Sequence, residues 1–153
     1  MAMSEALSSQ DVQAAWAKLA DEVRTGVLLT LRDGRPFGSH VPYVFGEHWT
    51  CAYIHVSRLA LHTEHLLRDS RVGLFVSESD RPGKNPLALR RMNLQGEAVL
   101  LNADAPDYAK VKERYLARFP PIGHDVRLCR FRPLGAAATG CSLGFGIWAG
   151  LPC

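Results

Sequence analysis

The sequence predicts a mainly β (α+β) protein built as a small antiparallel β-barrel with peripheral helices. Segments with strand character come in hairpin-linked groups, and segments with helical periodicity interrupt them singly. A doubly wound parallel sheet would instead alternate strands and helices. Six or seven strands in roughly 120 residues can close a small barrel whose side chains fill its interior. A ligand is therefore expected on the outside or between subunits.

The first elements are a helix and a hairpin. Within residues 1–24, apolar residues recur at spacings of four, three and four, which places them on one helical face: Val12, Trp16, Leu19 and Val23. Two apolar runs then flank Asp33-Gly34, a strong hairpin signal. A turn at residues 46–48 leads into a third run. We expect three sequential antiparallel strands, which are the first strands of a barrel that spans residues 25–153. The whole chain, residues 1–153, is expected to form a single domain.

The second half of the chain alternates helices with strands. Residues 58–68 predict a helix, residues 71–79 a strand, and the loop 80–89, with two prolines and a glycine, little regular structure. Residues 90–101 return to strand. The next helix begins with Asp104 as N-cap and Pro106 in its first turn. Its apolar face holds Tyr108, Val111, Tyr115 and Phe119. One or two further strands follow in residues 126–141.

Composition excludes several classes of function. The net charge is only +3, from 18 basic and 15 acidic residues that are scattered along the chain, so no nucleic-acid surface is expected. The four cysteines show no CxxC pair and the six histidines no ligand set, which argues for reduced thiols and against a metal. No secretory signal and no run of ~20 apolar residues is present, so no membrane segment is expected. The expected location is cytoplasmic.

The junction Ser57-Arg58 is the candidate binding feature, because a predicted strand there passes into a predicted helix. Ser57 is placed to cap the helix, and the first helical amides favour phosphate. The expected apolar arc of this helix is Leu59, Ala60, Thr63, Leu66 and Leu67, with Arg58, His62 and His65 grouped beside it. A phosphate would then meet a hydroxyl, amides, a guanidinium and an imidazole. The alternative is a serine that only caps the helix beside a solvated arginine.

Two stretches, "IHVSRLALHTEHLLRDSRVGLFVSE" and "NPLALRRMNLQGEAVLL", resemble the pyridoxamine 5'-phosphate oxidase-like, FMN-binding split β-barrel family. They are most similar to its haem-utilisation branch. The run Ser-Arg-Leu-Ala-x-His-Thr from Ser57 to Thr63 is the most specific part. The closing "FRPLGAAATGCSLGFGIWAG" resembles the terminal strand pair of that branch. The similarity covers about residues 27–145 and implies that the barrel is a split β-barrel.

The resemblance also implies a cofactor site. FMN would place its phosphate near Ser57 and Arg58, with His62 and Thr63 lining the same pocket. Arg91 or its neighbour Arg90 would complete the site. Val41, Pro42 and Tyr43 would run beside the isoalloxazine ring. The family implies a homodimer with flavin at the interface, and the apolar Leu61 within the polar arc of its helix agrees with such an interface.

The resulting hypothesis is an FMN-binding flavoprotein that acts as an oxidoreductase on a small molecule of unknown identity. No catalytic residue is assigned, because hydride transfer belongs to the cofactor. The position after Arg58 is Leu59, where the true oxidase carries a lysine. A haem-binding or haem-degrading protein, a non-catalytic flavin-binding module, and a deazaflavin in place of FMN remain as alternatives. The segment "GFGIWAG" is expected to be structural or adjacent to the flavin.

Overall fold

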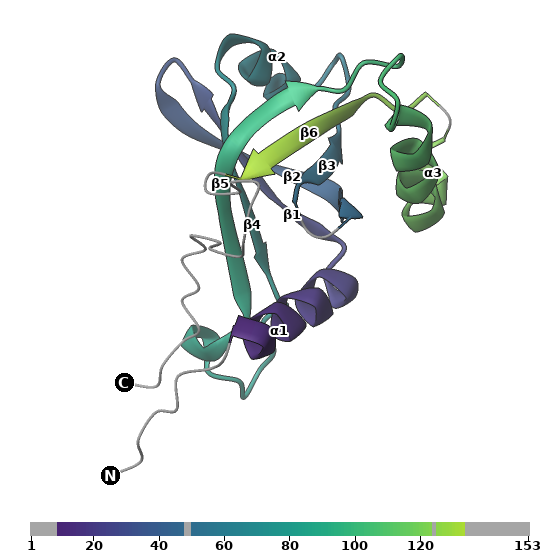
Figure 1. Cartoon of the computed structure of the whole chain (residues 1–153). Helices are drawn as coiled ribbons and strands as arrows, with labels where there is room; N and C mark the ends of the chain where they lie inside the picture. The colour runs from purple at the N-terminus through teal and green to yellow at the C-terminus, as the bar shows by residue number, and fades with distance from the viewer. Residues whose placement is uncertain (1–8, 48–49, 124, 134–153) are drawn as a thin grey trace.

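The structure is a computed structural model that describes residues 9–47, 50–123 and 125–133 (Figure 1). Its elements, in chain order, are α1 (Ser9–Glu22), β1 (Thr25–Arg32), β2 (Arg35–Phe45), β3 (Ala52–His55), α2 (Leu61–Arg68), β4 (Arg71–Ser77), η2 (Pro86–Ala88), β5 (Arg91–Leu100), α3 (Tyr108–Arg118), η3 (Pro120–Ile122) and β6 (Leu128–Pro133). The segments 1–8 and 134–153 lie outside the described residues. The predictions for "GFGIWAG" and for a strand after β6 therefore stay predictions.

The described strands form a closed barrel in the order β1-β2-β3-β6-β5-β4, and every neighbouring pair is antiparallel. This confirms the predicted mainly β fold with peripheral helices. Figure 1 shows α1 and α2 at opposite ends of the barrel, with α3 beside β3 and β6. None of the helices in the described ranges is long and apolar enough to cross a membrane.

The hairpin between β1 and β2 forms where the Asp33-Gly34 pair predicts it. Asp33 has φ 51° and Gly34 has φ 76°, so both residues adopt the left-handed conformation. A two-residue turn of this kind matches the right-handed twist of the flanking strands, and Asp-Gly is a favoured sequence for it. The register then pairs Arg32 with Arg35 and continues to Thr25 with Pro42.

Apolar side chains fill the barrel interior. The largest fully buried ones include Leu28, Ile54, Leu74, Leu94 and Phe131, each 1% exposed or less. At one end, α1 contributes buried residues from its predicted apolar face, namely Trp16 and Leu19. An interior filled in this way leaves the outer surface of the barrel for a ligand, as the strand count predicts.

A second cluster of buried residues lies between α3 and the strands beside it. Val111, Tyr115 and Phe119 of α3 pack there with Val44 of β2 and Tyr53 of β3. The predicted apolar face of this helix is therefore confirmed.

The predicted start of α3 is wrong, because Asp107 and not Asp104 occupies the N-cap position. Two successive turns, in which the Ala105 amide donates to Asn102 and the Tyr108 amide donates to Ala105, occupy the preceding segment. Pro106 disfavours helical backbone at the residue before it, which explains the later start.

Candidate functional site

Ser57 organises a tight turn between β3 and α2. Its Oγ accepts a hydrogen bond from the Leu59 amide at 3.2 Å, and its carbonyl accepts one from the Ala60 amide at 3.2 Å. The helix begins only at Leu61, and its N-cap position is Ala60, which makes no side-chain capping bond. The predicted helical cap at Ser57 is therefore wrong: the serine stabilises the turn that leads to the helix.

Thr63 fixes the same turn from the side of the helix. Its hydroxyl donates to the Ser57 carbonyl at 2.5 Å, and the residue is only 5% exposed. The hydroxyl hydrogen is thus used within the protein. In this geometry Thr63 supports the Ser57 turn and has only the lone pairs of its oxygen left for a ligand.

Arg58 follows Ser57 in this turn. Its side chain is exposed, and within the part of the chain that the structure describes it makes no hydrogen bond or ion pair. The amides of Arg58, Leu61 and His62 likewise have no backbone acceptor among the described residues. Because Ser57 Oγ uses a lone pair for the Leu59 amide, its own proton is available to another acceptor. Hydroxyl, guanidinium and amides here are all donors, which suits an anion.

The direct pairing of β2 and β3 is interrupted next to this turn, and we call this interruption the opening between β2 and β3. The two strands pair from Phe45 with Ala52 to Tyr43 with Ile54. At the next position Pro42 would face His55, but the Tyr115 hydroxyl of α3 lies between them. It accepts from the His55 amide at 3.2 Å and donates to the Pro42 carbonyl at 3.1 Å. Tyr115 is 0% exposed, and this burial raises its pKa to about 12, so the hydroxyl keeps its proton at neutral pH.

His62 is half-buried near this opening, and its Nε2 is buried without a hydrogen-bond partner among the described residues. Burial lowers the pKa of His62, and the neighbouring His55 and His65 lower it further, while a hydrogen bond to the His55 backbone acts in the opposite direction. A bond that raises the pKa of an imidazole is one that it donates, so the acceptor is the His55 carbonyl. Nε2, which has no partner among the described residues, is the ring nitrogen left for a ligand.

His65 does not belong to a polar arc, contrary to the prediction. It is 4% exposed, its Nδ1 lies 2.9 Å from the Thr30 hydroxyl of β1, and its ring contacts Phe37 edge-on with centroids 4.9 Å apart. The hydrogen bond with Thr30 of β1 offsets the cost of removing the imidazole from water. In turn, Leu59 and Leu67, expected on the buried arc, are 95% and 67% exposed.

The three residues expected beside a flavin ring differ in orientation. Val41 and Tyr43 are each 1% exposed in the interior, and the Tyr43 hydroxyl donates to the Val23 carbonyl at 2.6 Å. Because successive side chains of a strand alternate, the half-buried Pro42 faces the outer surface. Only Pro42 therefore offers its side chain to an outer ligand, whereas Val41 and Tyr43 offer backbone atoms.

Arg91 lies far from the Ser57 turn within one chain. It pairs with Ser77 at the end of β4, whereas Arg71, at the start of β4 and close to α2, pairs with Glu97. Arg71 and Ser77 are six positions apart along the strand, or ~20 Å. Figure 1 shows the start of β5 near α1, at the other end of the barrel from α2. The structure does not bring Arg91 together with Ser57 and Arg58.

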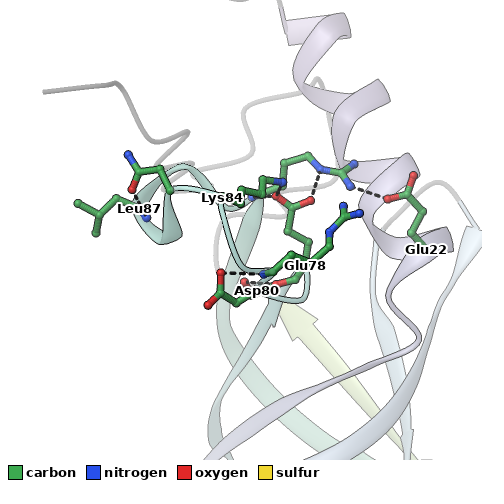
Figure 2. Close-up of polar contacts among 9 residues, drawn as sticks. Glu22, Glu78, Asp80, Lys84 and Leu87 are labelled. Atoms are coloured by element: carbon green, nitrogen blue, oxygen red, sulfur yellow. Dashed lines mark hydrogen bonds and ion pairs between the residues drawn. The ribbon is translucent and has the colours of Figure 1, made fainter.

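Arg90 belongs to an ion network and not to the Ser57 site. Its Nε donates to Glu78 Oε2 at 3.0 Å, and its terminal nitrogen donates to Glu22 Oε2 of α1 at 2.5 Å (Figure 2). Glu78 also accepts from Lys84 Nζ at 2.7 Å and from the Arg90 amide at 2.8 Å. We call these four side chains the Glu78 network. It ties the loop between β4 and β5 to α1 and occupies the Arg90 guanidinium.

Sequence reasoning missed Tyr115, which it places only on the apolar face of α3. One signal was present: a proline in the middle of an apolar strand marks a position where a ladder hydrogen bond is absent. Within the described ranges, no group of three or more His, Cys, Asp or Glu side chains is placed to hold a metal ion.

Comparisons with known proteins give one family and one fold. The sequence profile described as "Pyridoxamine 5'-phosphate oxidase" matches residues 12–138. Among solved structures, HutZ, the haem storage protein from Vibrio cholerae, is 23% identical with a TM-score of 0.69, covering 79% of this chain and 89% of that one. No curated protein sequence matches the chain.

Two further structures share the fold. The haem binding protein from Mycobacterium smegmatis is 23% identical with a TM-score of 0.67, and the match covers 84% of this chain and 53% of that one. An FAD-binding protein from Mesorhizobium loti is 16% identical with a TM-score of 0.60, covering 82% and 88%. At these identities the likeness shows the fold alone.

Proposed function

Since the chain belongs to the pyridoxamine 5'-phosphate oxidase family, whose profile covers residues 12–138, we propose that it is an FMN-binding flavoprotein that acts as an oxidoreductase. The cofactor would lie on the outer surface of the barrel, at the opening between β2 and β3. When bound, FMN supplies the redox chemistry, and the protein supplies position, hydrogen bonds and exclusion of competing reactions.

The observation that carries the proposal is the buried Nε2 of His62, which has no partner among the described residues. Buried polar atoms in folded proteins nearly always have a hydrogen-bond partner, so an unpartnered ring nitrogen beside the opening favours a ligand that brings a hydrogen-bonding group. FMN carries such groups in its ribityl hydroxyls and its ring N–H. The residues at the opening therefore fit a flavin.

The Ser57 turn fits the phosphate of the same cofactor. The Ser57 hydroxyl proton, the unpaired Arg58 guanidinium and the free amides at the start of α2 are all donors. Charge-assisted hydrogen bonds to phosphate are about twice as strong as neutral ones. Thr63 holds this turn in place through the Ser57 carbonyl.

A homodimer completes the proposal. Leu59, just before α2, and Leu61, its first residue, are 95% and 48% exposed, and a second protomer would cover them. Arg91, remote from Ser57 in one chain, could then reach the Ser57 turn of the other protomer. Light scattering of the purified protein measures its oligomeric state directly. A stable monomer that binds FMN tightly would contradict a site between subunits.

The phosphate site is tested by replacing Arg58. One charged hydrogen bond contributes about 1.5 to 3 kcal/mol, so the net loss of one such bond in Arg58→Ala should weaken FMN binding roughly 10- to 150-fold. Arg58→Lys should recover only part of this, because an ammonium lacks the planar fork. Riboflavin, which has no phosphate, should bind all three proteins alike. Arg32→Ala is the control, since Arg32 is also an exposed arginine and is the last residue of β1. Equal FMN affinity for wild type and Arg58→Ala, with the fold intact by circular dichroism, would contradict the assignment.

Haem binding is the second candidate, and one observation favours it. A metal-binding histidine also needs a ring nitrogen without a protein partner, and the buried Nε2 of His62 has no partner among the described residues. The absorbance spectrum of protein purified without added cofactor separates the candidates. The two absorption bands of a flavin support the proposal, a Soret band supports haem, and a single violet band in place of the flavin pair supports a deazaflavin. Turnover of a reduced nicotinamide then separates an oxidoreductase from a non-catalytic flavin module.

A further inference from the structure

The hydrogen bonds of β2 show which side of the strand is interrupted. The Tyr43 amide donates toward β1, to the Arg24 carbonyl at 3.4 Å, whereas the Gly46 amide donates toward β3, to the Cys51 carbonyl at 2.8 Å. Because amides alternate in direction along a strand, position 42 faces β3. Pro42 has no N–H, so it cannot donate to His55 across this pair.

The Tyr115 hydroxyl takes the place of the missing pair. A hydroxyl both donates and accepts, so a single oxygen satisfies the His55 amide at 3.2 Å and the Pro42 carbonyl at 3.1 Å. The aromatic ring is fully buried between α3 and the strands, which fixes the oxygen in position. A side chain inserted between two strands keeps them further apart than a direct hydrogen bond would.

The interruption also explains the orientation of His62. In an antiparallel pair, the amide and carbonyl of one residue face the same neighbouring strand, so the His55 carbonyl faces Pro42 and receives no hydrogen bond from it. The backbone of His55 instead interacts with the His62 ring, and this interaction raises the pKa of His62 against the effect of burial. The Nε2 of the same ring has no partner among the described residues. Pro42 and Tyr115 thus lead, through His55, to the atom that carries the proposed function.

We infer that Tyr115 is a positioning residue for the cofactor site: its hydroxyl, acting with Pro42, holds β2 and β3 apart and so fixes His55 and His62. This inference rests on the proposed function, which assigns the opening to a cofactor. Tyr115 belongs to α3, which contributes none of the cofactor residues implied by the family resemblance. Its expected effect is therefore indirect, on the shape of the site and not through contact with the ligand.

Tyr115→Phe tests this inference, with Tyr108→Phe as the matched control. Tyr108 lies on the same helix, and its hydroxyl also donates to a backbone carbonyl, that of Val126, at 2.9 Å. We expect Tyr115→Phe to weaken FMN binding about tenfold, as the loss of roughly one hydrogen bond's worth of positioning predicts. Tyr108→Phe should bind within twofold of wild type. Equal FMN affinity in wild type and Tyr115→Phe would overturn the inference.

Two NMR measurements separate positioning from a general loss of stability. In Tyr115→Phe the His55 amide should exchange its hydrogen faster and the titration of the His62 ring should shift, whereas Tyr108→Phe should change neither. Pro42→Ala acts on the same pair from the other side, because the new amide can donate to the His55 carbonyl and compete with His62. It should lower the pKa of His62 and weaken FMN binding without lowering the melting temperature.

Failure of the proposed function would look different from failure of this inference. If wild-type protein binds no FMN, the proposed function is wrong, and the two NMR measurements alone decide the role of Tyr115. Unchanged His55 exchange and unchanged His62 titration in Tyr115→Phe would then overturn it. Changes in both measurements for Tyr115→Phe, with no change in either for Tyr108→Phe, would support the positioning role of Tyr115.

Discussion

Replacing Glu78 with glutamine should destabilise the protein far more than an ordinary surface change. The Glu78 side chain is 8% exposed and accepts from the Lys84 ammonium at 2.7 Å and from Arg90 through both its amide and its guanidinium. Glutamine can still accept from the Arg90 amide, but it loses the negative charge and presents an NH2 group to other donors. Two charge-assisted hydrogen bonds are weakened.

The size of the effect follows from the exposure of the partners. A hydrogen bond to a charged group contributes about 1.5 to 3 kcal/mol. Lys84 and Arg90 are 35% and 39% exposed, so in the variant water can form part of the hydrogen bonds that these two side chains no longer make to Glu78. About 1 kcal/mol per bond gives a loss of roughly 2 kcal/mol in the free energy of unfolding. For a domain of this size the melting temperature should fall by about 4 to 8 °C.

The pH dependence of this difference has a definite sign. The hydrogen bonds from Lys84 and from the Arg90 amide lower the pKa of Glu78 from 4.5 to about 2. A carboxylate whose pKa is lowered by folding contributes stability that is complete above its unfolded pKa and is lost as the pH falls toward the folded value. The gap between wild type and Glu78→Gln should therefore be constant from pH 7 to about 5 and should narrow steadily toward pH 2.

Thermal and urea unfolding of wild type, Glu78→Gln and Glu64→Gln at pH 7, 5 and 3 provide the measurement. Glu64 is the control, because it pairs with Arg68 at the same distance of 2.7 Å, but these two side chains are 55% and 70% exposed. Its replacement should change the free energy of unfolding by at most ~0.5 kcal/mol. Equal melting temperatures for the two variants at pH 7 would refute the reasoning.

Two further predictions concern buried side chains. Thr63→Val removes the donor to the Ser57 carbonyl, so it should cost about 1 kcal/mol of stability and weaken FMN binding; unchanged values in urea unfolding and FMN titration would contradict this. Cys129 is 1% exposed, and burial raises the pKa of its thiol to about 12, so at pH 8 iodoacetamide should label it only after unfolding. Labelling of the native protein, located by mass spectrometry, would show that the strand opens.

Features set by neighbouring residues could be predicted from the sequence. Asp33-Gly34 makes a hairpin because two consecutive left-handed residues are required there, and that requirement is local. The buried face of α3, with Val111 and Tyr115, follows from helical periodicity alone. The antiparallel, hairpin-linked character of the barrel follows from these local patterns together, whereas the position of β6 between β3 and β5 does not.

Features set by distant partners could not be predicted. The Ser57 turn ends where the Thr63 hydroxyl reaches its carbonyl, which delays the helix to Leu61. His65 is buried because Thr30, 35 residues away, gives it a partner. Arg90 is engaged by Glu22, 68 residues away, so it is not available for phosphate. In each case an interaction between segments far apart in the chain overrides the local pattern.

The order of strands in the barrel has a consequence for synthesis and folding. The strand β6, formed by residues near the end of the described chain, inserts between β3 and β5, pairing His55 with Leu128 on one side and Leu100 with Cys129 on the other. Without that strand, the order β3-β2-β1-β4-β5 leaves β3 and β5 with unpaired edges. Contacts between residues this distant in sequence form late and slow the folding of β-rich domains. A growing or truncated chain that ends before Leu128 therefore exposes two ready edges, and pairing between such edges is how incomplete sheets associate with one another.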